Sequence, residues 1–234
     1  MEEYREFDFF RGKIKLRQPK SHRLSVVEVL FVANLKGIRK SSKVLDLGAG
    51  FGALSVLIAL KHLCPVWAVE RDPLMLELLR ENLRLNNIED RVHLLERDLR
   101  TLRGAFEPKC FDVVVANPPF YKQSGKSDGY HHESDTTLKD FIETGALFLR
   151  DGGYFNLLIA SDRLVEALSH MERLNMHLAY LRIFYPKVSK NGKIARITAV
   201  KNLSPRPVVE KPLIINLEEG GYTQEVSEII SSFL

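Results

Sequence analysis

A glycine-rich turn between two apolar segments is the feature that most restricts what this chain can fold into. Residues 46–52 have the sequence Asp-Leu-Gly-Ala-Gly-Phe-Gly, with the apolar run 44–47 leading into them and the apolar stretch 54–63 following. Glycine allows positive φ angles and a close approach of the backbone to a ligand, and the first turn of a helix presents unpaired N–H groups. The pattern predicts a nucleotide-type pocket at the carboxyl end of a parallel strand. We expect it to be formed by Asp46, Gly48, Ala49, Gly50 and Gly52.

Strand-like and helix-like segments alternate along most of the chain. Apolar runs typical of buried strands occupy residues 44–47, 66–69, 92–95, 111–116 and 154–160. Apolar positions at helical spacing occupy residues 24–35, 54–63, 73–87, 138–149 and 164–174. This alternation predicts an α/β fold with a doubly wound, mostly parallel sheet covered by helices on both faces. The runs 178–185 and 194–201, joined by the turn-rich connector 186–193, predict an antiparallel edge.

The distribution of charge divides the predicted single domain, residues 1–234, into three parts. The net charge is +4, but residues 1–43 carry eleven Lys and Arg against five Asp and Glu, whereas the middle of the chain is slightly acidic. We interpret residues 1–43 as a basic N-terminal extension with a short strand near 13–17. Residues 181–234 form the antiparallel edge and a C-terminal region that ends in a short helix. Two basic ends suit surfaces for a polyanion, and simply solvated termini are the alternative.

Two carboxylates follow the next two strands of the predicted sheet. Glu70 ends the second strand, where a carboxylate can accept hydrogen bonds from both hydroxyls of a ribose. Asp98, followed by Leu99, lies just after the third strand, where it could receive the amine of an adenine. Asp72 and Glu96 are alternatives that lie away from the strand ends. Residues 48–53 also satisfy the dinucleotide pattern GxGxxA, so a nicotinamide cofactor remains open at this point.

The sequence Asn117-Pro118-Pro119-Phe120 follows the fourth strand, and a nicotinamide dehydrogenase has no need of it. Consecutive prolines hold the backbone extended, so the Asn117 side chain and the Pro118 carbonyl become two rigid acceptors in the crevice. Two acceptors can bind both hydrogens of the amino group of a base, and Phe120 offers a face on which an extruded base can stack. The motif predicts methylation of an amine, with Asn117, Pro118 and Phe120 as the catalytic residues and Asn117 also near the cofactor.

At these motifs the chain resembles the class I S-adenosylmethionine-dependent methyltransferases that modify amino groups. Over nearly its whole length it is similar to the tRNA1(Val) adenine-amino (YfiC-like) methyltransferase family, in stretches that include residues 18–33, 150–155, 185–187 and 220–223. The resemblance implies a single methyltransferase domain with a Rossmann-like, seven-stranded sheet, S-adenosylmethionine as cofactor and structured tRNA as substrate.

The chain departs from the family pattern at two positions. Phe120 replaces the more common tyrosine, which keeps the stacking face and loses a hydroxyl. The family usually has an aspartate where this chain has Val27; Glu28 is adjacent, but on a helix we expect it to point elsewhere.

The connector and the strand after it are rich in basic residues. Residues 181–211 contain eight Lys and Arg and one acidic residue, Glu210. Contacts to tRNA phosphates are expected from Lys187, Lys190, Lys193 and Arg196. A solvated hairpin is the alternative.

Residues 131–135, His-His-Glu-Ser-Asp, fit no standard ligand spacing, and we expect no metal site. With two widely spaced cysteines, no apolar run long enough for a membrane span and a charged N-terminus, the expected location is the cytoplasm, without a membrane partner. Nothing in the sequence calls for an obligate protein partner.

The leading hypothesis is a methyltransferase for the exocyclic amine of adenine in tRNA, near the anticodon. The same acceptor motif would serve rRNA, DNA or a protein glutamine, whose amide presents the same two donors. From other classes, a nicotinamide-dependent oxidoreductase and a non-catalytic nucleic-acid-binding module remain alternatives.

Overall fold

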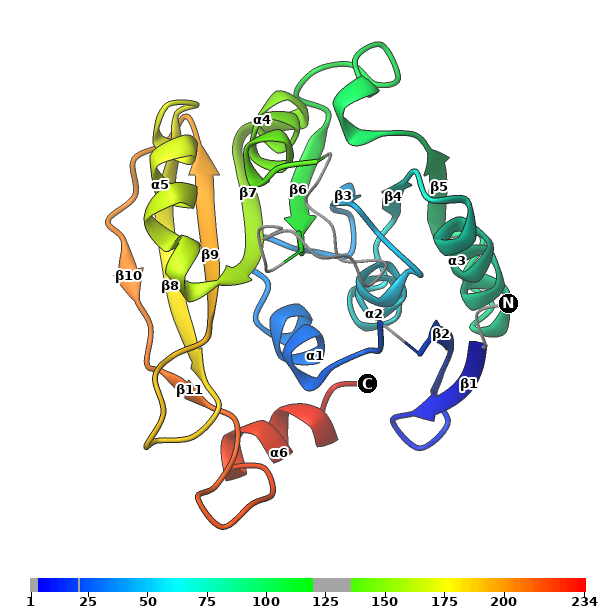
Figure 1. The fold of residues 1–234 in the computed structure, drawn as a ribbon. Coiled ribbons are helices and arrows are strands. Elements are labelled where there is room, and N and C mark those ends of the chain that lie inside the picture. The colour runs from blue at the N-terminus through cyan, green and yellow to red at the C-terminus, as the bar shows by residue number, and fades with distance from the viewer. Residues whose placement is uncertain (1–3, 21, 120–135) are drawn as a thin grey trace, which may run out of the picture.

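The structure is a computed structural model that describes residues 4–20, 22–119 and 136–234. The chain alternates between strands and helices (Figure 1). The strands are β1 (Tyr4–Phe9), β2 (Ile14–Pro19), β3 (Val44–Leu47), β4 (Val66–Glu70), β5 (Val92–Glu96), β6 (Phe111–Ala116), β7 (Leu149–Ala160), β8 (Met176–Tyr185), β9 (Ile194–Lys201), β10 (Val208–Val209) and β11 (Leu213–Ile214). The helices are α1 (Val26–Ala33), α2 (Ala53–His62), α3 (Pro73–Leu85), α4 (Leu138–Phe148), α5 (Leu164–Glu172) and α6 (Gln224–Ser231), with short 3₁₀ turns at Leu99–Thr101 and Ser161–Arg163.

One large sheet organises the domain, with the strand order β10-β8-β9-β7-β6-β3-β4-β5 and β11 paired to β8. The seven longer strands form the predicted seven-stranded sheet, to which β10 and β11 add two residues each. β9 runs antiparallel to both β7 and β8, and the other pairs are parallel. The predicted doubly wound fold with an antiparallel edge pair is therefore confirmed. The order also reverses beside β3, where neighbouring connections leave on opposite faces and open a crevice at the carboxyl ends.

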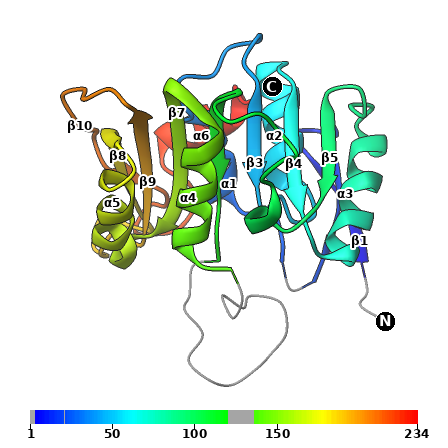
Figure 2. The same cartoon turned by 90° about the horizontal axis from the view of Figure 1, so that it is seen from above.

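Helices cover both faces of this sheet. Figure 2 shows α4 and α5 on one face and α1, α2 and α6 on the other. Successive residues of β3 divide between two buried clusters, since Val44 packs on the side of α1 and α2 whereas Leu45 and Leu47 pack on the side of α4. This alternation follows from the two-residue period of a strand. No helix among the described residues has both the length and the apolar character needed to cross a membrane.

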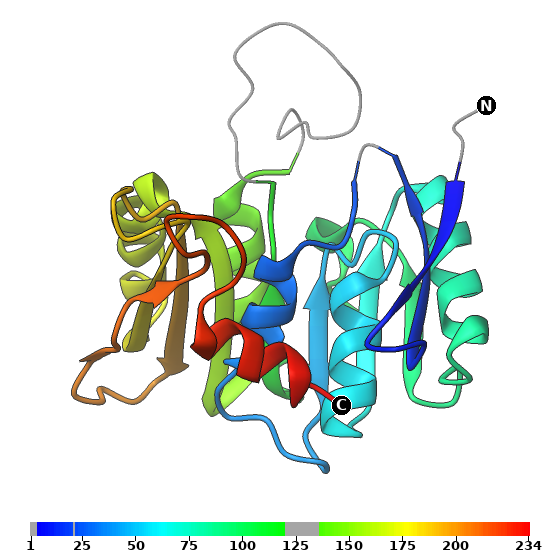
Figure 3. The same ribbon diagram turned by 90° about the horizontal axis from the view of Figure 1, so that it is seen from below.

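A separate antiparallel hairpin, β1–β2, precedes the sheet and crosses over α2 and α3 in the view of Figure 3. The sequence predicts β2 but not β1, whose side chains are mostly polar or exposed. Asn82 of α3 ties the hairpin down, because its Oδ1 accepts from the Arg17 N–H at 2.6 Å and its Nδ2 donates to the Arg17 carbonyl at 2.9 Å. The same Nδ2 donates to the Phe51 carbonyl at 2.8 Å. The hairpin, α3 and the glycine turn are thus joined at one buried amide.

Candidate active site

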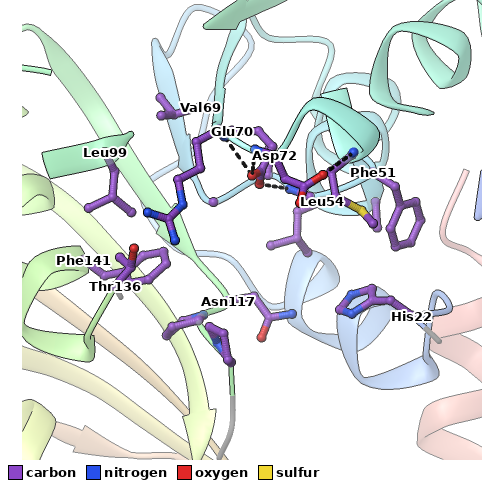
Figure 4. Close-up of a pocket in the computed structure, with 18 of the residues that line it drawn as sticks. His22, Phe51, Leu54, Val69, Glu70, Asp72, Leu99, Asn117, Thr136 and Phe141 are labelled. Carbon is purple, nitrogen blue, oxygen red and sulfur yellow. Dashed lines mark hydrogen bonds between the residues drawn. The ribbon is translucent and has the colours of Figure 1, made fainter. Parts of the chain in front are cut away.

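A cavity of about 580 Å³ lies at the carboxyl ends of β3, β4 and β6. It falls within the size range of small-molecule sites. Figure 4 shows Leu99 and Phe141 on one side of the cavity and His22 and Phe51 on the other, with Asn117 between them. The predicted site residues that line it are Gly48, Ala49, Gly50, Glu70, Asp98, Leu99, Asn117 and Pro118. Residues from separate segments, predicted independently, therefore meet at one cavity.

The glycine turn between β3 and α2 forms one wall. Gly50 has a φ of +56°, and a Cβ atom built on it would meet nothing within 4 Å, so the backbone there is open towards the cavity. Gly52, with a φ of +92°, is required for a different reason: a Cβ atom would lie 2.2 Å from Leu79 Cδ1 of α3. Gly52 is not among the lining residues. The structure gives Gly52 a packing role behind the turn, and its contact with the cofactor stays a prediction.

Glu70 at the end of β4 is held by three backbone N–H groups. Its Oε2 accepts from Gly50 at 2.8 Å, and its Oε1 accepts from Arg71 at 2.8 Å and Asp72 at 2.9 Å. This fixes the carboxylate towards the turn and leaves acceptor capacity on Oε2. Asp72 also lines the cavity, but its Oδ1 accepts from the backbone of Leu74 and caps α3. The geometry favours Glu70 over Asp72 as the acceptor for a ligand.

Asp98 lies in the cavity wall with both oxygens already engaged. Oδ1 accepts from the Arg100 N–H and Nε, and Oδ2 accepts from Arg100 Nη2 at 2.6 Å and Arg71 Nη1 at 2.8 Å. The Arg100 guanidinium, with Arg71, holds the pKa of this carboxyl well below its usual range although partial burial opposes the shift. A carboxylate has about four acceptor positions, so an adenine amine would have to displace one of these donors. The alternative Glu96 pairs with Arg80 and does not line the cavity.

Asp46, which the sequence predicts to contact the cofactor, lies beneath the glycine turn and is not among the residues that line the cavity. Its side chain is fully buried, and its Oδ2 accepts from Ser55 Oγ of α2 at 2.6 Å. Oδ1 has no hydrogen-bond partner among the described residues. Burial raises the pKa of Asp46 to about 7, against the hydrogen bond from Ser55 and with smaller contributions from the charges of Glu70 and Glu28. Asp46 thus supports the turn through α2.

Asn117 follows β6 and projects into the cavity (Figure 4). Its Oδ1 is buried and has no hydrogen-bond partner among the described residues, whereas its Nδ2 donates to Glu28 Oε1 at 3.4 Å. Buried carbonyl oxygens are nearly always paired, and among the described residues this one still has room for a donor. Pro118 and Pro119 line the cavity beside it. Phe120, the predicted stacking residue, lies outside the described residues.

Glu28 is the main site residue that sequence reasoning placed wrongly. It was expected to point away from the site, but it lines the cavity and is only 6% exposed. The reason is a capping box: α1 begins after Ser25, and the Glu28 side chain turns back to accept from the Ser25 N–H at 2.8 Å. Burial raises the pKa of Glu28, and hydrogen bonds from Ser25 and Asn117 oppose that shift. The S-x-x-E spacing was the signal in the sequence that could have indicated this turn.

Other lining residues, which the sequence did not single out for the cofactor, include His22, Arg23, Ser25, Phe51, Thr136 and Phe141. His22 contacts Phe51 edge to face, with ring centroids 5.4 Å apart. Phe141 of α4 packs beside Gly48, where a Cβ atom would lie 2.9 Å from its ring. The segment before α1 and the start of α4 therefore close the two sides of the cavity.

Arg196 cannot contact phosphates, so that part of the predicted nucleic-acid surface is wrong. Its side chain is fully buried in β9, donates to the Asn34 carbonyl at 2.7 Å and pairs with Glu210. Lys190 and Lys193 are exposed on the connector, whereas Lys187 is half-buried and donates to the Glu218 carbonyl. None of the three lysines lines the cavity. Among the described residues, no group of three His, Cys, Asp or Glu side chains could hold a metal ion.

Comparison with known proteins gives consistent results. Residues 23–182 match the family model described as methyltransferase small domain. The tRNA1(Val) (adenine(37)-N6)-methyltransferase of Phocaeicola vulgatus is 26% identical over 195 residues, which cover 81% of each chain. The release factor glutamine methyltransferase of Rhodopirellula baltica is 28% identical over 209 residues, covering 86% of this chain and 68% of that one. A crystal structure of a predicted O-methyltransferase from Agrobacterium tumefaciens shares the fold, with a TM-score of 0.71 at 21% identity over 87% of this chain and 94% of that one.

Proposed function

The chain belongs to the methyltransferase small domain family, and from that premise we propose that it methylates the exocyclic amine of adenine in RNA, with tRNA near the anticodon as the substrate. The cofactor of this methyltransferase is S-adenosylmethionine. The substrate proposal draws support from the tRNA-modifying relatives, whose similarity extends over most of both chains.

The residues present fit that cofactor. The open backbone at Gly50 provides room for close approach, and the carboxylates of Glu70 and Asp98 face the same cavity. Ribose hydroxyls would find acceptor capacity on Glu70, and an adenine amine would take the place of one of the donors that Asp98 now accepts. When bound, S-adenosylmethionine supplies a methyl group that its sulfonium already activates. The protein therefore needs to align the acceptor nitrogen more than it needs a strong base.

The observation that carries the amine chemistry is the unpaired Oδ1 of Asn117. Asn117 lines the cavity, and its Oδ1 is buried without a donor among the described residues, so it could accept one hydrogen of an NH2 group. We assign the second hydrogen to the Pro118 carbonyl. Together the two acceptors would bind both hydrogens of the amine and favour a pyramidal nitrogen whose lone pair faces the methyl donor. The nitrogen can lose its extra proton after methylation, when its acidity has risen.

A glutamine side chain is the second candidate substrate, because its amide presents the same two hydrogens. The similarity to the release factor glutamine methyltransferase favours it specifically. We rank RNA first because exposed Lys190 and Lys193, at one end of a connector with no acidic residue, offer positive charge for phosphates.

The test is methyl transfer from labelled S-adenosylmethionine into bulk tRNA, followed by mass spectrometry of the nucleosides. We expect N6-methyladenosine with the wild-type protein and a loss of at least about a hundredfold in kcat with Asn117→Ala, the scale found when one preorganised hydrogen-bond group is removed from an active site. Asn202→Ala is the matched control, since Asn202 is exposed and bonds to Asp151 away from the cavity. Methyl groups found only on ribose or on a ring carbon of the tRNA would refute the proposal. Methyl transfer to the glutamine of a release factor, in a parallel reaction, without transfer to tRNA would also refute it.

A further inference from the structure

The Asn117 side chain can face the substrate in two ways, and only one of them is productive. With Oδ1 towards the cavity it accepts a hydrogen from the substrate amine. If the amide were rotated by half a turn, its NH2 group would face the NH2 group of the substrate, and two donors would meet. Something in the protein has to select the first orientation.

Glu28 is placed to make that selection. Its Oε2 accepts from the Ser25 N–H at 2.8 Å and from Ser25 Oγ at 3.2 Å, which fixes the carboxylate at the start of α1. Its Oε1 then stands 3.4 Å from Asn117 Nδ2. The hydrogen bonds from Ser25 and Asn117 favour the ionised form of Glu28 against the effect of burial on its pKa. Because an ionised carboxylate only accepts hydrogen bonds, the end of the amide that it pairs with must be the NH2 group.

We propose that Glu28 is a positioning residue for methyl transfer: it pairs with Nδ2 of Asn117 and thereby holds Oδ1 towards the substrate amine. The inference deepens the proposed function and rests on it. It concerns the hydrogen-bond acceptor for the substrate amine and not the affinity for the cofactor. The residues predicted to bind the cofactor, Glu70 and Asp98, are held by other contacts.

Glu28→Gln is the decisive substitution, because glutamine at this position preserves the capping box. To accept from the Ser25 N–H, the new Oε1 must take the place of Oε2, so the new Nε2 takes the place of Oε1 and presents donors to Asn117. The Asn117 amide then turns its oxygen away from the cavity. We expect kcat for methylation of bulk tRNA to fall at least about tenfold, with the KM for S-adenosylmethionine unchanged.

A second substitution, Asn117→Asp, should restore the pairing between positions 28 and 117 that Glu28→Gln breaks. Asn117→Asp alone sets two carboxylates against each other. In Glu28→Gln/Asn117→Asp, the NH2 group of the new amide at position 28 can donate to one oxygen of the new carboxylate at position 117, while the other oxygen faces the cavity as an acceptor. We expect kcat of the double variant to exceed that of Asn117→Asp about tenfold. Thr223→Ala controls for the loss of a helix cap elsewhere, since Thr223 caps α6, and it should leave kcat unchanged.

Unfolding free energies of the same variants, measured in urea without cofactor or RNA, provide a readout that does not depend on activity. The double variant should be more stable than Asn117→Asp, which gives a favourable coupling between the two positions. Losses in kcat and stability that simply add would overturn the inference, as would a Glu28→Gln variant that is impaired only in the KM for S-adenosylmethionine. If wild-type protein methylates no tRNA, the proposed function fails, and the stability coupling alone then decides the pairing of Glu28 with Asn117.

Discussion

The unfolding free energy of the Asp46→Asn variant, measured relative to that of the wild type, should increase as the pH rises. Burial raises the pKa of Asp46 from its ordinary value of 3.8 to about 7 in the folded protein. Between these values the folded state binds a proton that the unfolded state has lost, so the stability of the wild type falls as the pH rises through this window. Each pKa unit corresponds to about 1.36 kcal/mol. The unfolding free energy of the wild type therefore falls by about 4 kcal/mol over the whole window, and about 3 kcal/mol of this loss occurs between pH 5 and pH 8.

Asp46→Asn removes this charge but keeps the size and the hydrogen-bonding partner Ser55. Because Oδ1 of Asp46 already lacks a partner among the described residues, the new amide leaves a buried group unpaired and costs about 1–3 kcal/mol at every pH. The constant cost cancels when the difference in unfolding free energy between variant and wild type is followed against pH. Glu28 also has a raised pKa, and it titrates in both proteins, so its contribution largely cancels as well.

The assay is urea unfolding of both proteins at pH 5, 6, 7 and 8 in the absence of ligand. Asp112→Asn is the matched control: burial opposes the shift, but hydrogen bonds from the Lys43 N–H and Arg150 lower the pKa of Asp112. Its titration lies below pH 3.8, so its difference from the wild type should be flat over this range. The assignment of a buried carboxyl with a raised pKa beneath the glycine turn would be refuted if the difference in unfolding free energy between Asp46→Asn and the wild type stayed constant or fell as the pH rises.

Two further predictions follow from the hairpin and from the connector. Asn82→Ala removes three hydrogen bonds that join Arg17 and Phe51 to α3, so it should lower the unfolding free energy by about 2–4 kcal/mol; a loss under about 1 kcal/mol in urea unfolding would contradict this role. Simultaneous replacement of the three connector lysines by alanine should weaken tRNA binding and reduce its dependence on salt concentration. Filter binding between about 50 and 200 mM salt that matched the wild type would contradict a role of these lysines in phosphate binding. The three residues are Lys187, Lys190 and Lys193.

The sheet and most of the site could be predicted from the sequence because they depend on local patterns. The glycine turn at 48–52, the carboxylate of Glu70 and the Asn-Pro-Pro segment each follow a strand, and parallel strands bring such positions to one edge. The hairpin strand β1 could not be predicted in this way. It is held by its pairing with β2, and β2 is held by amide contacts to α3 across more than sixty residues of sequence.

Glu28 and Arg196 are both placed wrongly by the sequence, and for the same physical reason. On the sequence each is a charged residue in an apolar element, and the usual expectation is that such a side chain points to water. Glu28 instead turns back onto the backbone of Ser25, which satisfies one carboxylate oxygen and lets α1 bury the other against Asn117. Arg196 lies on a strand enclosed by β7 and β8, and it is buried because Asn34 and Glu210 reach it from the segments that cover the sheet. A buried charge requires partners. Glu28 has one of its partners, Ser25, three residues away, whereas the partners of Arg196 come from distant parts of the chain. The nearer partner makes Glu28 predictable from a capping box, and the distant ones make Arg196 predictable only from the assembled sheet.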